Sequence, residues 1–297
     1  MPPQTKNKEM EEKMLNRREC LKGSAVGLLT AALPGLRAET ANGRALGVQL
    51  YTLRTIIDKD LHGTLAAVRA IGYRQVETYV AEYAMGAREL RKAIEDAGLA
   101  VPSAHFGYID FEARLDYCAE LGAECAVCSM VPLNLARSGD DYKRAAAQYN
   151  RWAEAAQKRG LRFGFHNHNV EFVSYDGRTG LEILLAETDP ARVGWQMDCY
   201  WVAQAGSDPV EMLRLHGSRV QSLHVKDRRP EATPTLTLGP ESAFFSEVGT
   251  GSMNWTAILA EAEKHHVRYL FVEQDQTQRP PLESLAISYR NLRRLLK

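Results

Sequence analysis

The sequence predicts a single (β/α)8 barrel, and three observations support this prediction. The chain has 297 residues, a length that fits one such barrel. From residue 46 onward, strand-like runs alternate with amphipathic helical stretches, which is typical of a parallel sheet. There are eight of these runs, and eight parallel units most often close into a barrel. The runs cover residues 46–52, 74–79, 101–106, 124–129, 161–166, 193–198, 220–225 and 268–273.

Helical stretches follow the strand-like runs. Four of these stretches end at Gly, the residue that most readily adopts the left-handed backbone conformation found at helix C-termini. A further helix is expected from Trp255, with Asn254 as its N-cap. The four stretches cover residues 61–72, 87–98, 111–122 and 141–160, and they end at Gly72, Gly98, Gly122 and Gly160.

Two segments interrupt the alternation. Residues 228–254 follow the seventh strand and are rich in Pro, Thr, Ser and Gly, so we expect a functional lid there. Residues 166–180 separate the fifth strand from the next helix. No linker or second domain is visible in residues 45–297.

The first 44 residues form a separate arm and signal segment. Arg17 and Arg18 precede a run of small and apolar residues, which is the layout of a twin-arginine export signal. The run is too short to span a bilayer, and cleavage near residues 38–42 would start the mature domain close to Ala45. An ordinary arm with a short helix is the alternative. We therefore expect an exported, periplasmic protein whose mature form contacts no membrane.

Composition limits the class of partner. Lys and Arg together number 37, as do Asp and Glu, so no net field draws the chain toward nucleic acid or an anionic membrane. A small, weakly charged molecule is the expected partner, and a homo-oligomer is compatible with this composition. The five Cys are an odd number without the dense spacing of disulfide-stapled domains, so we expect no essential disulfide.

The ends of the predicted strands carry many residues with ligand chemistry. The carboxyl ends of all strands in such a barrel converge on one mouth, so their side chains meet there. Random strand ends would not be so rich in carboxylates and imidazoles. The strand-end residues are Tyr51, Glu77, His105, Ser129, His166, Asp198, His224 and Glu273, with His168 and Glu171 just beyond the fifth strand.

Three of these residues predict a metal site. Asp198, His224 and Glu273 end three consecutive strands. Two carboxylates and one imidazole form a hard, mainly oxygen site that suits a divalent cation, and Glu171 is the candidate fourth ligand. A lone acid or imidazole is better explained by a hydrogen bond to a neighbouring loop, but three in a row favour metal binding.

Five motifs carry a resemblance to a known family. HNHNVEF, MDCYW, HVKD, VGTGSMNW and VEQD resemble the sugar phosphate isomerase/epimerase superfamily of xylose isomerase-like barrels over nearly all of residues 46–297. The resemblance implies one divalent metal, Mn²⁺, Co²⁺, Mg²⁺ or Zn²⁺, held by Glu, Asp, His and Glu from strands 5 to 8. By position, the last three ligands fall on Asp198, His224 and Glu273.

The fifth strand departs from the pattern of the epimerases in this superfamily. Those enzymes end it with Glu, whereas this chain has Gly164, Phe165 and His166 at the matching positions. Either Glu171 folds back from the loop onto the metal, or His166 or His168 replaces the missing carboxylate. We favour Glu171, because three carboxylates make the harder site and loops can reach back over the mouth. The two His residues would then face the substrate or support the ligands.

The expected chemistry is proton transfer beside a carbonyl. A cation that chelates a carbonyl and a neighbouring hydroxyl acidifies the C–H between them and stabilises an enediolate. A carboxylate or imidazole then removes the proton. Metal-bound Glu residues do this in the epimerases, so the resemblance assigns catalytic roles to Glu273 and Glu171, and His168 is a further candidate. Lys226 is a candidate partner for a substrate oxygen, with an ion pair to Asp227 as the alternative.

Other residues near the mouth are candidates for substrate binding. Glu77 and His105 are expected on the opposite side of the mouth, where they would bind sugar hydroxyls. His166 and Trp201 are further candidates, and aromatic side chains at the mouth can stack on a sugar ring and exclude water. A His at a strand end is also often a hydrogen-bonded core residue.

These inferences favour a metal-dependent isomerase or epimerase that acts on a keto-sugar or cyclitol. No Gly-rich phosphate cradle stands out, so an unphosphorylated substrate is expected. A lyase or dehydratase at the same metal site is the alternative, for example one that eliminates from a 3-keto-glycoside or dehydrates an inosose. A non-catalytic sugar-binding barrel is less favoured, and so is an endonuclease IV-like nuclease, which needs more metal ligands and a basic groove.

Overall fold

The structure is a computed structural model that describes residues 45–79 and 85–297. The predicted N-terminal arm and twin-arginine segment, residues 1–44, lie outside the described residues. Within the described part of the chain, none of the helices is long and apolar enough to cross a membrane.

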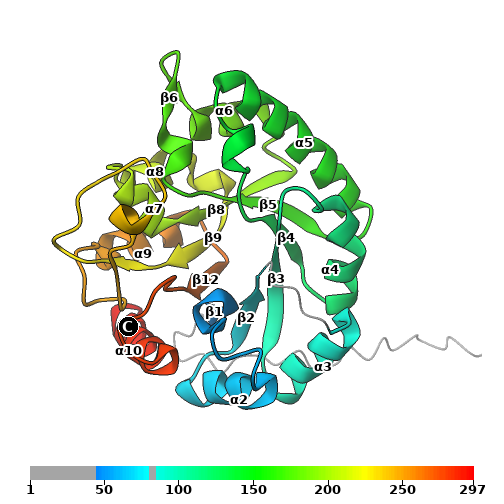
Figure 1. Ribbon diagram of the computed structural model, residues 1–297, viewed down its shortest axis with the longest axis vertical. Coiled ribbons are helices and arrows are strands. Elements are labelled where there is room, and N and C mark those ends of the chain that lie inside the picture. The colour runs from blue at the N-terminus through cyan, green and yellow to red at the C-terminus, as the bar shows by residue number, and fades with distance from the viewer. Residues whose placement is uncertain (1–44, 80–84) are drawn as a thin grey trace, which may run out of the picture. The chain divides into compact units, whose positions relative to one another are not determined.

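Eight parallel strands form a closed barrel in the order in which they occur along the chain, which confirms the predicted fold (Figure 1). Each predicted strand-like run overlaps one barrel strand. The first and last strands pair, with Leu46 opposite Leu270, and so close the barrel. The strands are β1 (Leu46–Gln49), β2 (Gln75–Thr78), β3 (Ala100–Phe106), β4 (Cys125–Cys128), β5 (Arg162–His166), β8 (Val193–Asp198), β9 (Val220–Val225) and β12 (Tyr269–Val272).

Helices connect the strands and cover the outside of the barrel (Figure 1). The side chain of Asn254 accepts a hydrogen bond from the Ala257 amide, which confirms the predicted N-cap. All four predicted Gly positions have a positive φ, which residues with a side chain disfavour. The φ angles are 129° at Gly72, 72° at Gly98, 82° at Gly122 and 73° at Gly160. The helices are α2 (Leu61–Ile71), α3 (Ala87–Asp96), α4 (Leu115–Leu121), α5 (Gly139–Gln157), α6 (Gly180–Glu187), α7 (Cys199–Gln204), α8 (Pro209–His216), α9 (Trp255–Lys264) and α10 (Pro281–Leu295).

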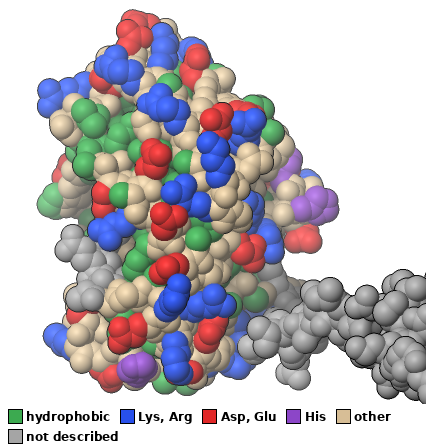
Figure 2. All heavy atoms as spheres, turned by 90° about the vertical axis from the view of Figure 1, so that its right-hand side faces the viewer, with side chains coloured by type: hydrophobic (Ala, Val, Ile, Leu, Met, Phe, Trp, Pro, Cys, Tyr) green, Lys and Arg blue, Asp and Glu red, His purple; other side chains and the backbone are tan. Residues whose placement is uncertain are grey.

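The outer face of the barrel carries interspersed charges. Figure 2 shows this pattern on the side where α3, α4 and α5 lie, with basic and acidic side chains next to one another. Exposed ion pairs such as Lys92 with Asp96 and Arg159 with Asp116 belong to it. Such pairs contribute little to stability, but they leave no large patch of one sign.

The alternation along β5 shows how the strands position the site. The rings of Phe163 and Phe165 lie 5.4 and 5.6 Å from the ring of Tyr149 in α5, so these two side chains point outward. Because successive strand residues point to opposite faces, Gly164 and His166 point into the barrel. The apolar core therefore lies between the strands and the helices, and the barrel interior near the strand ends holds polar groups.

The two irregular segments predicted after the fifth and seventh strands are partly ordered by short antiparallel pairs. Short 3-10 turns also occur in other connections. The segment after β5 contains η4 (Val170–Phe172), β6 (Ser174–Tyr175) and β7 (Arg178–Thr179), and the segment after β9 contains β10 (Asp227–Arg228), η6 (Pro240–Ser242) and β11 (Phe245–Ser246). The other 3-10 turns are η1 (Leu50–Leu53), η2 (Glu112–Arg114), η3 (Leu133–Leu135) and η5 (Gly217–Arg219).

Asp227 anchors the segment after β9. Its buried carboxylate accepts hydrogen bonds from the backbone amides of Gly249, Gly251 and Met253 at 2.7, 3.3 and 3.1 Å. It also accepts one from the indole Nε1 of Trp255 at 3.0 Å. One carboxylate thus fixes the return of this segment to the start of α9.

Asn169 joins the two irregular segments. Its Nδ2 donates hydrogen bonds to the carbonyl oxygens of Thr235 and Thr237, both at 2.8 Å. The exit of β5 and the long segment after β9 are therefore attached to each other.

Candidate active site

A cavity of about 860 Å³ opens where the carboxyl ends of the strands converge. This volume accommodates a sugar-sized molecule. One part of the lining is polar and comprises Gln49, His105, Ser129, His166, His168, Lys226, Glu273 and Asp275. Another part is apolar or aromatic and comprises Tyr51, Tyr79, Tyr108, Ile109, Met130 and Pro132.

Three of the predicted metal ligands meet at this cavity. Ligand atoms of Asp198, His224 and Glu273 all lie within 4.8 Å of one another. His224 Nδ1 lies 2.8 Å from Glu273 Oε2 and 3.7 Å from Asp198 Oδ2. Asp198 and His224 are completely buried, whereas Glu273 also lines the cavity. The barrel therefore brings together the residues that end three consecutive strands.

Glu77, at the end of β2, lies on the other side of His224. Its Oε1 accepts hydrogen bonds from His224 Nε2 at 2.5 Å and from Gln49 Nε2 at 2.9 Å, and its Oε2 accepts one from Gln196 Nε2 at 2.7 Å. Burial would raise the pKa of Glu77, but the nearby imidazoles of His105 and His224 outweigh burial and lower it. Glu77 is completely buried and holds other side chains, so it lies away from the cavity lining where sugar hydroxyls would bind.

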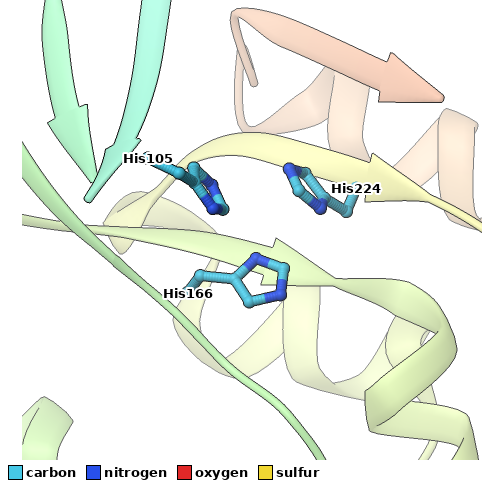
Figure 3. Close-up of side chains that lie close together, drawn as sticks. All are labelled: His105, His166 and His224. Atoms are coloured by element: carbon cyan, nitrogen blue, oxygen red, sulfur yellow. The ribbon is translucent and has the colours of Figure 1, made fainter. Parts of the chain in front are cut away.

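Gln196 connects Glu77 to two more imidazoles. Its Oε1 lies 2.5 Å from His105 Nε2 and 3.1 Å from His166 Nδ1. Figure 3 shows His105, His166 and His224 converging from β3, β5 and β9. The ring of His166 lies 4.5 Å from that of His224, and these three imidazoles form a second group of possible metal ligands.

Lys226 lies among the carboxylates of the site. Its Nζ is 2.9 Å from Asp198 Oδ2, 2.7 Å from Glu273 Oε2 and 2.8 Å from Asp275 Oδ1. Burial would lower the pKa of Lys226, but these three negative charges outweigh burial and raise it well above its usual range. The alternative pairing with Asp227 does not form, because Asp227 binds the amides of its own loop and Lys226 is buried.

Glu171 lies outside the group formed by Asp198, His224 and Glu273. Its Oε2 accepts a hydrogen bond from the backbone amide of His168 at 2.7 Å, and burial raises the pKa of its carboxyl to about 7. At the end of β5, His166 is the residue near the group, with its Nε2 3.6 Å from Asp198 Oδ2. The structure therefore places an imidazole where the resemblance expects a carboxylate.

His168 lines the cavity with a neutral ring. Burial first, and then the positive charge of Lys226, lower the pKa of His168 to about 3. Its ring lies 5.3 Å from that of Trp201. Neutral imidazole can accept a proton or hydrogen-bond a substrate hydroxyl.

The predicted substrate-binding residues divide between two spaces. His105 and His166 line the cavity, while Trp201 lines an adjoining pocket of about 570 Å³. The cavity and the pocket share Tyr51 and Asp275. The room available to a ligand therefore extends from the cavity beside Asp198, His224 and Glu273 toward the long segment after β9.

The donor set fits a divalent cation. Asp198 Oδ2 is buried, and its one close polar contact among the described residues is the ion pair with Lys226 Nζ at 2.9 Å, which leaves this oxygen a further lone pair for a cation. His166 Nε2 and His224 Nδ1 lie 3.6 and 3.7 Å from this oxygen. Two ligand atoms that each bond one ion at about 2.1 Å lie at roughly this separation. Mixed carboxylate and imidazole ligands suit ions such as Zn²⁺ and Mn²⁺.

Three polar residues of the site were missed by the sequence reasoning, namely Gln49, Gln196 and Asp275. Gln196 stands two residues before Asp198 on β8, so the strand period places both on the same inward face. Asp275 stands two residues after Glu273 and contacts Lys226. The signal that could have identified Gln196 was a polar side chain at an inward-facing position of an otherwise apolar strand.

Comparison with known proteins shows that this chain is similar to enzymes that act on sugars and cyclitols. The sequence matches the protein family described as Xylose isomerase-like TIM barrel over residues 65–295. An inosose dehydratase of Lactiplantibacillus plantarum is 25% identical over 209 residues, which cover 63% of this chain and 69% of that protein.

The chain is also similar to proteins of known structure. A crystal structure of a sugar phosphate isomerase/epimerase from Parabacteroides distasonis is 25% identical with a TM-score of 0.74, and the match covers 90% of this chain and 99% of that one. A structure of the IOLI protein with a zinc atom is 13% identical with a TM-score of 0.66 and covers 85% of this chain and 98% of that one. The latter likeness concerns the fold alone.

Proposed function

Because this chain belongs to the xylose isomerase-like TIM barrel family, we propose that it is a divalent-metal-dependent lyase or dehydratase acting on a keto-sugar or cyclitol. Proteins similar to this chain include an inosose dehydratase and a sugar phosphate isomerase/epimerase. The proposed reaction removes a proton from the carbon next to a carbonyl and expels an oxygen from the carbon beyond it.

This proposal is supported by the unequal distribution of acidic and basic side chains around the cavity. Three carboxylates lie beside Lys226, and two of them, Glu273 and Asp275, follow β12. The side chains that the exit of β5 adds to the lining are imidazoles, and Glu171 does not line the cavity. Asp110, also in the lining, is exposed and paired with an arginine. An elimination needs a base and an acid near adjacent carbons, and two neighbouring carboxylates supply both.

Glu273, Asp275 and Lys226 each have a role in this reaction. A bound cation would polarise the substrate carbonyl and acidify the neighbouring C–H. Glu273 takes the proton from carbon, and Asp275 gives a proton to the leaving oxygen as its bond to carbon breaks. Lys226 lies 2.7 and 2.8 Å from these two carboxylates, holds them in place and offsets negative charge that develops on the substrate.

The space beside the cavity favours a leaving group larger than water. The pocket of about 570 Å³ shares Asp275 with the cavity, so a group that leaves with the help of Asp275 has room there. Trp201 and Phe245 give this pocket aromatic walls, which suit a sugar ring or an aromatic aglycone. Keto-glycosides are therefore included among the proposed substrates.

An isomerase or epimerase is the second candidate function. Its support is the likeness to the Parabacteroides distasonis structure over nearly the whole chain. In this case Glu273 removes the proton and, once protonated, returns it to carbon, while the neutral imidazole of His168, which lines the cavity from the exit of β5, hydrogen-bonds a substrate hydroxyl.

Incubation with keto-sugars, inososes and 3-keto-glycosides in D₂O, with added divalent metal, distinguishes these functions. A lyase or dehydratase releases an alcohol or water and forms an unsaturated product. An isomerase or epimerase returns an isomer of the substrate that carries deuterium. Wild-type protein that binds a divalent ion but catalyses neither reaction on any of these substrates would contradict both proposals, and Glu273→Gln serves as the inactive control.

A further inference from the structure

We propose that a buried pair, Glu77 and Gln196, positions His166 as the fourth ligand of the metal. The pair does this by holding hydrogen on one ring nitrogen of each imidazole, so that the other nitrogen of His166 and of His224 is the one a cation would bind. This proposal rests on the metal-binding part of the proposed function and concerns how this chain replaces the carboxylate that its fifth strand lacks.

Glu77 is the starting point of the network. An ionised carboxylate only accepts hydrogen bonds, so every nitrogen that contacts it carries hydrogen. His224 Nε2 lies 2.5 Å from Glu77 Oε1, and it therefore carries hydrogen. His224 Nδ1 lies 2.8 Å from Glu273 Oε2, so in the metal-free protein it carries hydrogen as well, and a bound cation would replace that hydrogen. This nitrogen faces Glu273 and Asp198.

The charge of Glu77 also fixes the orientation of Gln196. Gln196 Nε2 donates to Glu77 Oε2 at 2.7 Å and to Ser222 Oγ at 3.1 Å. A flipped amide would place its oxygen against the carboxylate, which is repulsive. The oxygen of Gln196 therefore points the other way, toward His105 and His166.

Gln196 Oε1 in turn sets the two remaining rings. It accepts from His166 Nδ1 at 3.1 Å and from His105 Nε2 at 2.5 Å, so both nitrogens carry hydrogen. His105 Nε2 is also 3.3 Å from Glu77 Oε1, a second acceptor, and this excludes it as a ligand atom. His166 is left with a lone pair at Nε2.

Two ring nitrogens face one carboxylate oxygen. His166 Nε2 and His224 Nδ1 lie 3.6 and 3.7 Å from Asp198 Oδ2, too far for hydrogen bonds but suited to ligands of one ion. Among the described residues, the one close polar contact of that oxygen is the ion pair with Lys226 Nζ at 2.9 Å. The three imidazoles in Figure 3 thus differ in role: His166 Nε2 and His224 Nδ1 face Asp198, and His105 stacks on His224.

The first experiment is a zinc titration of the full-length protein after chelator treatment, read by competition with a chromogenic chelator. His166→Asn keeps a donor near the Nδ1 position for Gln196 but lacks Nε2, and we expect it to bind zinc at least about 100-fold more weakly. His105→Gln keeps a donor near the Nε2 position and is the matched control. We expect its zinc affinity to stay within a few-fold of wild type, with melting temperatures of both metal-free variants reported alongside.

The second experiment identifies the protonated nitrogens directly. Long-range ¹H–¹⁵N NMR spectra of the metal-free protein, with ¹⁵N-labelled histidine, should show hydrogen at Nδ1 of His166 and at Nε2 of His105. Gln196→Met, which keeps the side-chain volume, should remove the preference for Nδ1 at His166 and weaken zinc binding by roughly 10- to 100-fold.

The outcomes separate this proposal from the proposed function. If wild type binds zinc and His166→Asn binds it equally well, His166 is not a ligand and only this inference fails. Equal losses in His105→Gln and His166→Asn overturn it as well, and so does hydrogen at Nε2 of His166 in the NMR spectra. If wild type binds no divalent ion, the proposed function fails together with it.

Discussion

Lys226 Nζ lies 2.7 Å from Glu273 Oε2, and both side chains are almost completely buried. The same ammonium contacts Asp198 and Asp275, so one residue balances the negative charge of three others. We predict that Lys226→Met destabilises the metal-free protein by about 3–5 kcal/mol, because buried carboxylates lose their counter-charge. A divalent cation should restore part of this loss. Urea unfolding with and without Mn²⁺ measures both effects, and an equal loss under the two conditions would contradict the prediction.

Asp275→Asn should separate the two halves of the proposed elimination. The asparagine keeps the shape of the side chain but cannot give a proton to the leaving oxygen. We expect product formation to fall by about 10²- to 10⁴-fold, while exchange of the substrate C–H with D₂O continues. Mass spectrometry of recovered substrate reports the exchange. A parallel loss of both activities would assign Asp275 to binding or to the first step instead.

Glu171 should make stability depend on pH. Burial raises its pKa to about 7 from an ordinary value of 4.5, so the folded protein keeps a proton that the unfolded chain has lost. This contribution is fully present below the unfolded pKa and is lost as pH rises through the folded one. Glu171→Gln should flatten the decline between about pH 5 and pH 8 and be the more stable protein at the alkaline end, by up to about 3 kcal/mol.

Urea unfolding of metal-free protein across this pH range tests the prediction. Glu89→Gln, at an exposed position, is the control and should leave the slope unchanged. An unchanged slope in Glu171→Gln would show that its carboxyl is ionised in the folded state.

Asp227→Asn should loosen the segment after β9. The amide keeps one acceptor oxygen but puts a donor against amides that already donate, so several of the hydrogen bonds to residues 249–255 are lost. A loss of about 2–4 kcal/mol is expected for a buried network of this kind. Limited proteolysis should cut within residues 229–254 before the rest of the barrel. If cleavage begins elsewhere at the wild-type rate, the anchoring role is wrong.

Arg17→Lys together with Arg18→Lys should abolish the proposed export. Twin-arginine signals are read through their paired arginines, so a chain with two lysines stays inside the cell. Fractionation of cells that express wild type and variant, followed by immunoblotting, gives the distribution. Equal amounts of the two proteins outside the cytoplasm would remove the support for a twin-arginine signal.

The strand ends could be predicted because a closed parallel barrel brings all of them to one mouth. The prediction of a shared site required only that Asp198, His224 and Glu273 end consecutive strands, and the structure brings them together. Glu171 could not be placed in this way. Its position depends on the turn at residues 170–172, which directs the carboxylate to the amide of His168, and strand periodicity says nothing about such a turn.

The sequence also could not predict how deep a side chain lies within the barrel. Glu77 ends its strand as expected, but the hydrogen bonds from Gln49, Gln196 and His224 that hold it below the cavity come from three other strands. These partners depend on register and side-chain conformation. The same holds for Lys226, whose reach toward Asp198 instead of Asp227 is decided by which carboxylates already have donors.

The hydrogen bonds from Asn169 to Thr235 and Thr237 bear on how the substrate range of this enzyme could change. They mean that the two segments bordering the mouth depend on each other for hydrogen-bond partners. A graft of residues 166–180 from a relative would arrive without the carbonyl partners it needs, and a graft of residues 229–254 would leave Asn169 without its acceptors. Loop exchange in this barrel should therefore transfer both segments at once.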